Sequence, residues 1–189
     1  MLKISNKIYK IMKKILIALV GVIIVAVVAA LLMPKDFKIE KSIVVNKDKA
    51  HVFGYVKMLK NGNEWNPWMK KGPNTDPTGV QTFKGEDGTV GFVNSWSSDK
   101  KEVGTGEQEI TAITPNEKVE IALRLEKPFK AAHNVYFTTE TVGENQTKVT
   151  WGMTGSTPFP ANLMCFFKQK EVAAKFAEGL ENLKANLEK

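Results

Sequence analysis

One stretch near the N-terminus limits what this chain can fold into more than any other. Residues 15–33 read ILIALVGVIIVAVVAALLM, nineteen residues in succession without a charge. As a helix that rises 1.5 Å per residue, the stretch is about 28 Å long, close to the roughly 30 Å hydrocarbon core of a bilayer. A helix in the core of a soluble domain has a polar face, which this stretch lacks. We therefore predict a transmembrane helix over residues 15–33.

The charges around this apolar stretch predict its orientation. Residues 1–14 contain five lysines and no acidic residue, and Lys13 and Lys14 adjoin the apolar run. Because basic residues favour the cytoplasmic side of a membrane, we expect residues 1–14 in the cytoplasm. Residues 34–189 then form one domain outside the membrane, in the periplasm or the extracellular space. The chain is predicted to be a single-pass protein of the cell membrane.

A cleaved signal peptide is the alternative interpretation of the same stretch. Val28, Ala29 and Ala30 satisfy a loose rule for cleavage after small residues. The apolar run is longer than the 7 to 15 residues usual for a signal peptide, which favours an uncleaved anchor. The only cysteine, Cys165, lies far from the run, so a lipid-modified cysteine is excluded as an anchor. The domain is exported in either case.

The net charge of +7 does not indicate nucleic-acid binding. Of 27 basic and 20 acidic residues, six lysines and no acid lie in the first 35 positions, which leaves 21 basic and 20 acidic residues. Arg124 is the only arginine, whereas phosphate and base recognition usually depends on arginine. A single cysteine and two histidines provide neither an internal disulfide nor a metal-ligand cluster. We expect no nucleic-acid partner, no metal and no cofactor.

Residues 37–189 show the signals of a mixed α+β domain. Apolar and polar residues alternate along the segment FKIEKSIVV, and Asp48 can cap a helix that continues to Leu59. A Pro- and Gly-rich loop is expected at residues 72–79, and Asn162 can cap a final helix over residues 163–187. Strands joined by short turns, which favour antiparallel pairing, are predicted at 80–84, 91–97, 104–114, 118–125, 130–142 and 147–155.

This order of elements resembles the START-like, polyketide cyclase/dehydrase superfamily, also called SRPBCC. The resemblance is carried by FKIEKSIVVNKDKAHVFGYV, NEWNPWMK, GFVNSW, VGTGEQEI, KVTW and the closing EGLENLKANLEK. It implies a helix-grip fold: a strongly curved, antiparallel seven-stranded sheet around a long C-terminal helix, with two short helices after the first strand. It also implies a cavity between sheet and helix that holds an apolar or amphipathic small molecule.

Large apolar side chains at expected inward positions are the candidate ligand-binding residues. Ordinary core packing is the alternative for each of them. The candidates are Trp65, Trp68, Met69, Phe92, Trp96, Phe137, Trp151, Met153, Leu163 and Phe167.

Two residues are candidates for a general acid or base in such a cavity. His133 is in phase with Val135 and Phe137, so it points either into the cavity or, as a residue at a strand end, toward the surface. Glu64 and Glu107 are expected near the cavity mouth without a charged or hydrogen-bonded partner, and Glu107 is the second candidate.

Three functions are compatible with these features. The leading prediction is a membrane-anchored domain that binds a hydrophobic small molecule or lipid. A polyketide cyclase or hydrolase is the first alternative, and a protein-interaction or stress-response module is the second. No known catalytic motif occurs, which favours binding over catalysis. A cavity of several hundred Å³ would favour ligand binding, and a filled core would favour the interaction module.

Overall fold

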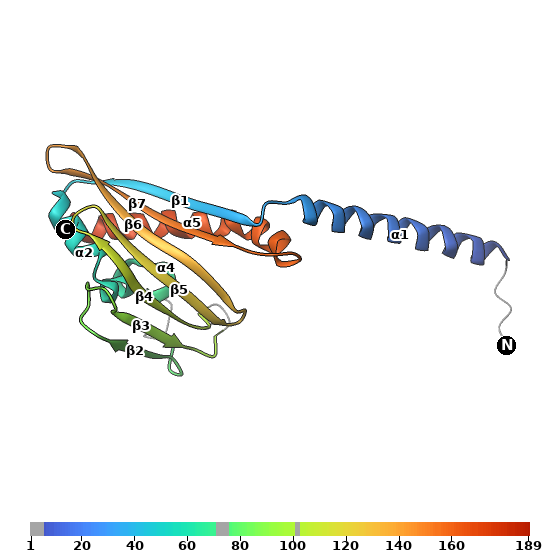
Figure 1. Cartoon of the computed structure of the whole chain (residues 1–189), viewed down its shortest axis with the longest axis horizontal. Coiled ribbons are helices and arrows are strands. Elements are labelled where there is room, and N and C mark those ends of the chain that lie inside the picture. The colour runs from blue at the N-terminus through green and yellow to red at the C-terminus, as the bar shows by residue number, and fades with distance from the viewer. Residues whose placement is uncertain (1–5, 71–75, 101–102) are drawn as a thin grey trace. The chain divides into compact units, whose positions relative to one another are not determined.

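The computed structural model describes residues 6–70, 76–100 and 103–189 (Figure 1). The chain divides into two compact units, one of Met1–Lys35 with Thr157–Phe167 and the other of Asp36–Ser156 with Lys168–Lys189. The start of the predicted cytoplasmic segment and the first half of the predicted loop at 72–79 lie outside the described residues.

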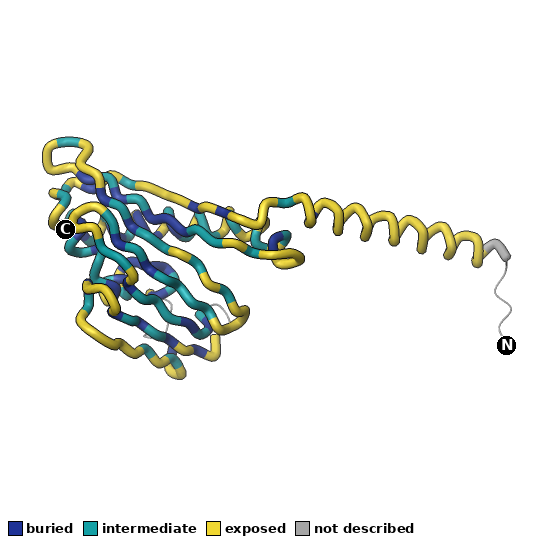
Figure 2. The backbone as a smooth tube through the Cα atoms, viewed as in Figure 1, coloured by how far each residue is buried: buried dark blue, intermediate teal, exposed yellow. Residues whose placement is uncertain are grey.

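The first unit is built around one long apolar helix. Helix α1 (Asn6–Leu32) begins earlier than the predicted 15–33 and carries the last N-terminal lysines on its first turns. Its segment Ile8–Leu32 contains an 18-residue stretch whose mean hydropathy is 3.4 and which is almost entirely exposed (Figure 2). By length and composition this helix can cross a membrane.

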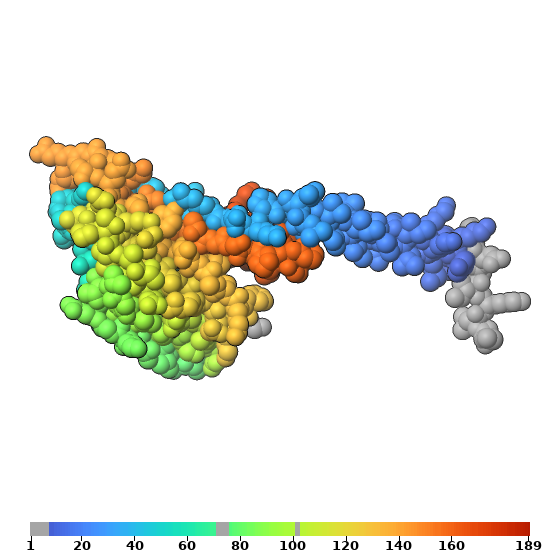
Figure 3. All heavy atoms as spheres, in the orientation of Figure 1, coloured from blue at the N-terminus to red at the C-terminus, as the bar shows by residue number. Residues whose placement is uncertain are grey.

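A second segment of the first unit packs against the C-terminal end of α1. The Asn162 side-chain amide donates to the Ala30 carbonyl oxygen at 2.7 Å, and the Thr157 N–H donates to the Lys35 carbonyl oxygen at 2.8 Å. In Figure 3 this segment, coloured orange to red, lies against the blue atoms at the end of α1. Ala30 is only 2% exposed as a result. Asn162 lies one residue inside the last helix, which begins at Ala161, rather than at its cap. Its side-chain oxygen accepts from the Leu163 N–H at 3.0 Å, while its amide group donates to α1.

The second unit contains an open, antiparallel seven-stranded sheet in the order β1-β7-β6-β5-β4-β3-β2. The helix-grip expectation is confirmed, and the predicted strand positions differ from the observed ones by a few residues at most. The strands are β1 (Asp36–Val45), β2 (Val80–Lys84), β3 (Val93–Ser97), β4 (Thr105–Thr114), β5 (Lys118–Lys127), β6 (Ala131–Gly143) and β7 (Gln146–Ser156).

Short helices follow β1, as predicted. The Asp48 carboxylate accepts from the His51 N–H at 2.9 Å and caps α2 (Lys49–Val56). The expected second helix is divided into single turns: η1 (Leu59–Asn61), α3 (Gly62–Trp65) and α4 (Pro67–Lys70). The break lies at Asn66, which is extended because a residue before proline disfavours the helical conformation.

The last helix, α5 (Ala161–Leu187), packs on one face of the sheet from Lys168 onward (Figure 1). Its buried residues Phe176, Leu180, Leu183 and Leu187 recur at helical spacing. They meet the inward side chains of the sheet, where each fully buried Leu or Phe contributes about 1.5–3 kcal/mol. The most deeply buried apolar residues on the inward face of the sheet include Val45, Ile110, Val119, Ile121, Phe137, Val149 and Trp151.

Candidate functional site

A cavity of about 260 Å³ lies between the inner face of the sheet and helix α5. Strands β5, β6 and β7 form its floor through alternating residues, which all point to the same face because side chains alternate along a strand. Helix α5 contributes Val172 and Phe176. The lining residues are Asn66, Trp68, Met69, Trp96, Val103, Gln108, Leu123, Leu125, Lys127, Pro128, His133, Val135, Trp151, Met153, Val172 and Phe176.

An aromatic cluster closes one end of this cavity. The rings of Trp151 and Phe176 stack with centroids 4.2 Å apart, and Trp65 meets Trp151 edge-on at 5.1 Å. Trp68 makes edge contacts with both members of the stacked pair. Phe137 completes the group against Trp65. Because these rings come from β6, β7, α3, α4 and α5, the cluster fixes the helices to the sheet.

A second, much smaller cavity of about 30 Å³ adjoins the first. It is lined by Trp65 and Phe137, and it shares Met69, Gln108 and Trp151 with the larger cavity. Its volume suits little more than a water molecule. The larger cavity is therefore the one that can hold an organic ligand.

His133 points into the larger cavity from β6, so the inward alternative is confirmed. Its ring packs edge-on against Phe37 at 5.3 Å, and its Nδ1 is buried without a hydrogen-bond partner. A Cβ at Gly155 would lie 2.5 Å from this Nδ1, so the imidazole needs a glycine there. Burial lowers the pKa of His133 below its usual value, which keeps the ring neutral at pH 7.

The two acids expected to lack partners at the cavity mouth are both paired, so that expectation is wrong. Glu64 accepts a hydrogen bond from the Tyr55 hydroxyl at 2.7 Å, and burial together with this bond raises the pKa of Tyr55 to about 12. Glu107 lies 2.6 Å from Arg124 Nε, and Arg124 also bonds Glu109. Glu107 therefore does not meet His133 in the cavity.

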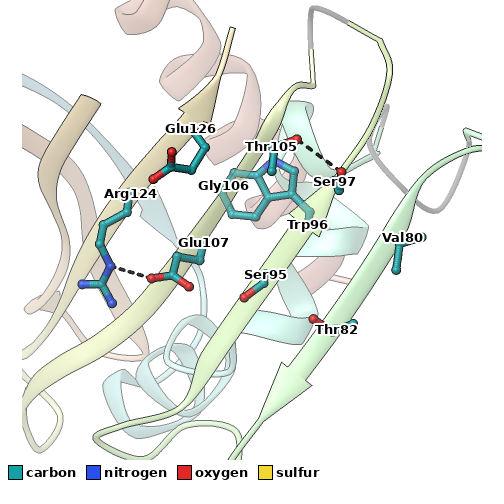
Figure 4. A pocket seen from close by; sticks show the side chains of 10 residues that line it. All are labelled: Val80, Thr82, Ser95, Trp96, Ser97, Thr105, Gly106, Glu107, Arg124 and Glu126. Carbon is teal, nitrogen blue, oxygen red and sulfur yellow. Dashed lines mark hydrogen bonds and ion pairs between the residues drawn. The ribbon is translucent and has the colours of Figure 1, made fainter. Parts of the chain in front are cut away.

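Glu107 and Arg124 lie on the opposite face of the sheet, in an outer groove of about 420 Å³ across strands β2 to β5 (Figure 4). Its polar groups bind one another: besides the Arg124 pairs, Ser97 and Thr105 share a hydrogen bond of 3.2 Å. The Trp96 ring, which also borders this groove, lies against Gly106, where an added Cβ would be 2.9 Å from its Cζ2. The groove is open to solvent, and each of its charged side chains already has a partner of opposite charge.

The predicted ligand-binding residues divide into two groups. Seven of them line one of the two inner cavities: Trp65, Trp68, Met69, Trp96, Phe137, Trp151 and Met153. The other three lie elsewhere. Phe92 is fully buried and stacks on Phe83, with centroids 6.0 Å apart. Leu163 and Phe167 belong to the first unit, and Phe167 is 70% exposed.

Several lining residues were missed in the sequence. Leu123 and Leu125 in β5 and Val135 in β6 lie in the inward phase of their strands, and this alternation is the signal that could have found them. For Val172 and Phe176, helical spacing is the only sequence pattern that indicates contact with the sheet. Among the described residues, no three His, Cys, Asp or Glu side chains gather in a way that could hold a metal ion.

Comparisons with known proteins agree with this architecture. Residues 36–188 match the family model described as polyketide cyclase / dehydrase and lipid transport. Among curated proteins, none matches the chain at a significant level.

Solved structures share the fold at low sequence identity. Protein CV1439 from Chromobacterium violaceum is 12% identical with a TM-score of 0.55, over 83% of this chain and 99% of that one. A Thermobifida fusca protein is 13% identical with a TM-score of 0.58, over 79% and 92%. The Aha1 dimer from Colwellia psychrerythraea is 18% identical with a TM-score of 0.52, over 80% and 96%. At such identities the likeness shows the fold alone.

Proposed function

Since the chain belongs to the polyketide cyclase / dehydrase and lipid transport family, we propose that its sheet domain binds a hydrophobic small molecule or lipid. The observation that carries the proposal is the cavity of about 260 Å³ inside the core. Most of its lining is apolar, as in ligand pockets generally. Pockets for drug-sized ligands start at about 300 Å³, so this one suits a small molecule or part of an acyl chain.

The cavity can be tested by filling it. We would extract the full chain from membranes in polymer-bounded lipid discs and identify co-purifying molecules by mass spectrometry. Leu123→Trp places a large ring in the cavity and should remove a specific ligand. Thr82→Trp adds the same ring to the outer groove and is the matched control. The proposal fails if no apolar molecule is enriched over the bulk lipid, or if both variants retain it equally.

A membrane anchor is the second part of the proposal. We assign residues 1–14 to the cytoplasm, 15–33 to the span and 34–189 to the domain outside. The exposed apolar surface of α1 supports this assignment. A group of exposed apolar side chains on the segment bonded to the end of α1 supports it as well: Phe159, Met164, Phe166 and Phe167. Exposed apolar side chains beside the end of a membrane-spanning helix suit shallow burial at the interface between lipid and water.

The orientation can be tested by moving the positive charge. Replacing Lys10, Lys13 and Lys14 by glutamine should leave part of the population inverted, because the cytoplasmic excess of lysine is reduced. Replacing Lys35, Lys38 and Lys41 by glutamine is the control and should leave the orientation unchanged. Protease accessibility of the domain, measured after any outer membrane has been permeabilised, reports the result. An inaccessible wild-type domain would contradict the assignment.

A cyclase-type enzyme is the second candidate, and His133 is the observation that favours it. A neutral imidazole on the wall of this cavity can accept or donate a proton at a bound substrate. Glu107 does not support this candidate, because it lies on the outer face. If wild-type protein alters the mass of a co-purifying molecule over time and His133→Phe does not, the enzyme is favoured over the binding protein.

A further inference from the structure

A backbone carbonyl near the end of α1 lacks its usual partner because of a proline. In an α-helix the carbonyl of each residue accepts from the N–H four residues later. For Ala30 that residue is Pro34, which has no N–H. The preceding carbonyl, that of Ala29, accepts in the ordinary way from the Met33 N–H at 3.1 Å. The Ala30 carbonyl therefore needs a donor from outside the helix.

Asn162 supplies that donor. Its side-chain amide bonds the Ala30 carbonyl oxygen at 2.7 Å, and both residues are buried. Ala30 precedes Met33, the last residue of the proposed span, by three positions, which places the bond about 4.5 Å inside the span. A carbonyl at such a depth cannot rely on water, so its donor has to come from the protein. Asn162 therefore lies at the level of the last turn of the membrane-spanning helix.

The segment that carries Asn162 has the composition of an element in contact with lipid. Residues 157–167 read TPFPANLMCFF, without a charge, and the next residue is Lys168. Exposed apolar side chains that occur together, rather than singly, mark a surface for a membrane or another protein. Four large apolar side chains of this segment are between 41% and 70% exposed: Phe159, Met164, Phe166 and Phe167.

Apolar residues surround the first turns of α5. Leu163 and Cys165 are half-buried, whereas Met164, Phe166 and Phe167 are exposed, so packing covers only part of the circumference. A helix that is apolar all round lies in a protein core or in a membrane. Among the residues that the structure describes, none covers the exposed part of these turns. The lipid around α1 is the apolar medium that continues from this surface.

From these observations we infer that residues 157–167 are a second membrane-embedded element, whose partner is the lipid of the leaflet on the domain side. The inference rests on the proposed anchor and adds a contact that α1 alone does not make. Interfacial helices bury their apolar face by about 5–10 Å, which agrees with the level of the bond between Asn162 and Ala30. Asn162 is the positioning residue, because it fixes the segment to the last turn of α1.

The test measures the depth of nitroxide spin labels in the full chain, reconstituted in lipid nanodiscs. Cys165 is replaced by serine, and one new cysteine is labelled at Phe167 or at a reference position. Ile23, exposed in the middle of α1, is the lipid reference. Val142 is the water reference: it is also exposed, at the turn before β7, about 33 Å along that strand from Ser156.

Power-saturation EPR compares two collision partners of each label: oxygen, which concentrates in lipid, and a nickel chelate, which stays in water. We expect the ratio of oxygen to nickel accessibility at Phe167 to lie well above that at Val142. It should approach the ratio at Ile23, because the label at Phe167 enters the apolar part of the leaflet.

A variant of Asn162 separates the depth of the segment from its fold. Asn162→Asp keeps the acceptor for the Leu163 N–H but cannot donate to the Ala30 carbonyl, and it places a charge below the membrane surface. The ratio at Phe167 should fall toward that of the water reference. Gln169→Glu is the matched control: it adds the same charge two helical turns further on and should leave the ratio unchanged. If Asn162→Asp does not fold, the labels on the otherwise unchanged chain still decide.

The possible failures are distinguishable. If the label at Ile23 meets the nickel chelate as readily as the label at Val142 does, the anchor proposal fails, and this inference fails with it. If Ile23 lies in lipid but Phe167 gives the ratio of Val142, the second membrane contact is overturned and the anchor stands. If neither oxygen nor nickel reaches Phe167, a protein surface such as a second copy covers the segment, which also overturns the inference.

Discussion

The ring of Trp151 lies parallel to the ring of Phe176, with an interplanar angle of 8° and centroids 4.2 Å apart. This stack joins β7 to the middle of α5, and both residues also line the cavity. The same pair therefore holds the helix on the sheet and forms a wall of the proposed binding site. Stability and ligand binding are expected to change together when it is altered.

Phe176→Ala should lower the free energy of unfolding of the sheet domain by about 3–5 kcal/mol, the usual cost of removing a buried phenylalanine ring. Phe176 is only 2% exposed and contacts Trp68 as well as Trp151. Urea unfolding of the reconstituted chain, followed by tryptophan fluorescence, measures the change. Phe167→Ala, at an exposed position of the same helix, should change the free energy by less than about 0.5 kcal/mol. Equal effects would contradict the role of the stack.

Gly179→Ala should destabilise the domain although alanine is the better helix former. The added methyl group would meet Trp151 at 2.6 Å, and the resulting overpacking costs about 1–3 kcal/mol. Gly54→Ala is the matched control in α2, because no atom lies within 4 Å of its added Cβ. There the substitution should stabilise by about 0.5–1 kcal/mol. Opposite signs in urea unfolding are expected, and a stabilising Gly179→Ala would show that α5 does not approach Trp151 this closely.

Strand phase explains which parts of the site could be predicted. Trp151 and Met153 share one phase of β7, so the sequence indicates a common inward face. The same rule places Glu107 with Glu109 on the outer face, and applying it to β4 would have removed Glu107 from the candidates. His133 remained ambiguous because its direction near a strand end depends on the neighbours Phe37 and Gly155, which come from other strands.

The cavity itself could not be predicted from local patterns. Phe92 has the same apolar character as Phe137 but fills core space beside Phe83. The apolar cluster of residues 163–167 looked suited to the cavity, yet Val172 and Phe176 supply the helix contacts. A gap between helix and sheet depends on how the two surfaces fit together. Periodicity reports only which residues face inward.

Two adjacent residues of β4 test the assignment of the two faces. Glu107→Gln should leave the binding of ethylnaphthalene, a small apolar probe, unchanged and lower stability by no more than about 1 kcal/mol, because its pair with Arg124 is partly exposed. Gln108→Glu places a carboxylate in the cavity wall and should weaken binding by at least about tenfold, since the ligand would have to desolvate a charge. Titrations monitored by NMR measure both. Loss of binding in Glu107→Gln would place the ligand in the outer groove.

The stability of the domain should decrease in mild acid because of His133. Burial lowers the pKa of this histidine below its ordinary value of 6.5, so below about pH 6.5 the unfolded chain binds a proton that the folded one excludes. The free energy of unfolding therefore falls as the pH decreases through this window and stops falling once the folded protein is also protonated. His133→Phe should remove this part of the pH dependence, measured by urea unfolding between about pH 7.5 and pH 5.5.

His51→Gln, at an exposed position of α2, should retain the dependence of the wild type. Glu40, whose pKa is lowered chiefly by a hydrogen bond from Tyr136, loses its contribution only at more acidic pH and does not obscure the comparison. A wild type whose stability is constant across the window would mean that the His133 ring is solvated rather than enclosed by the cavity.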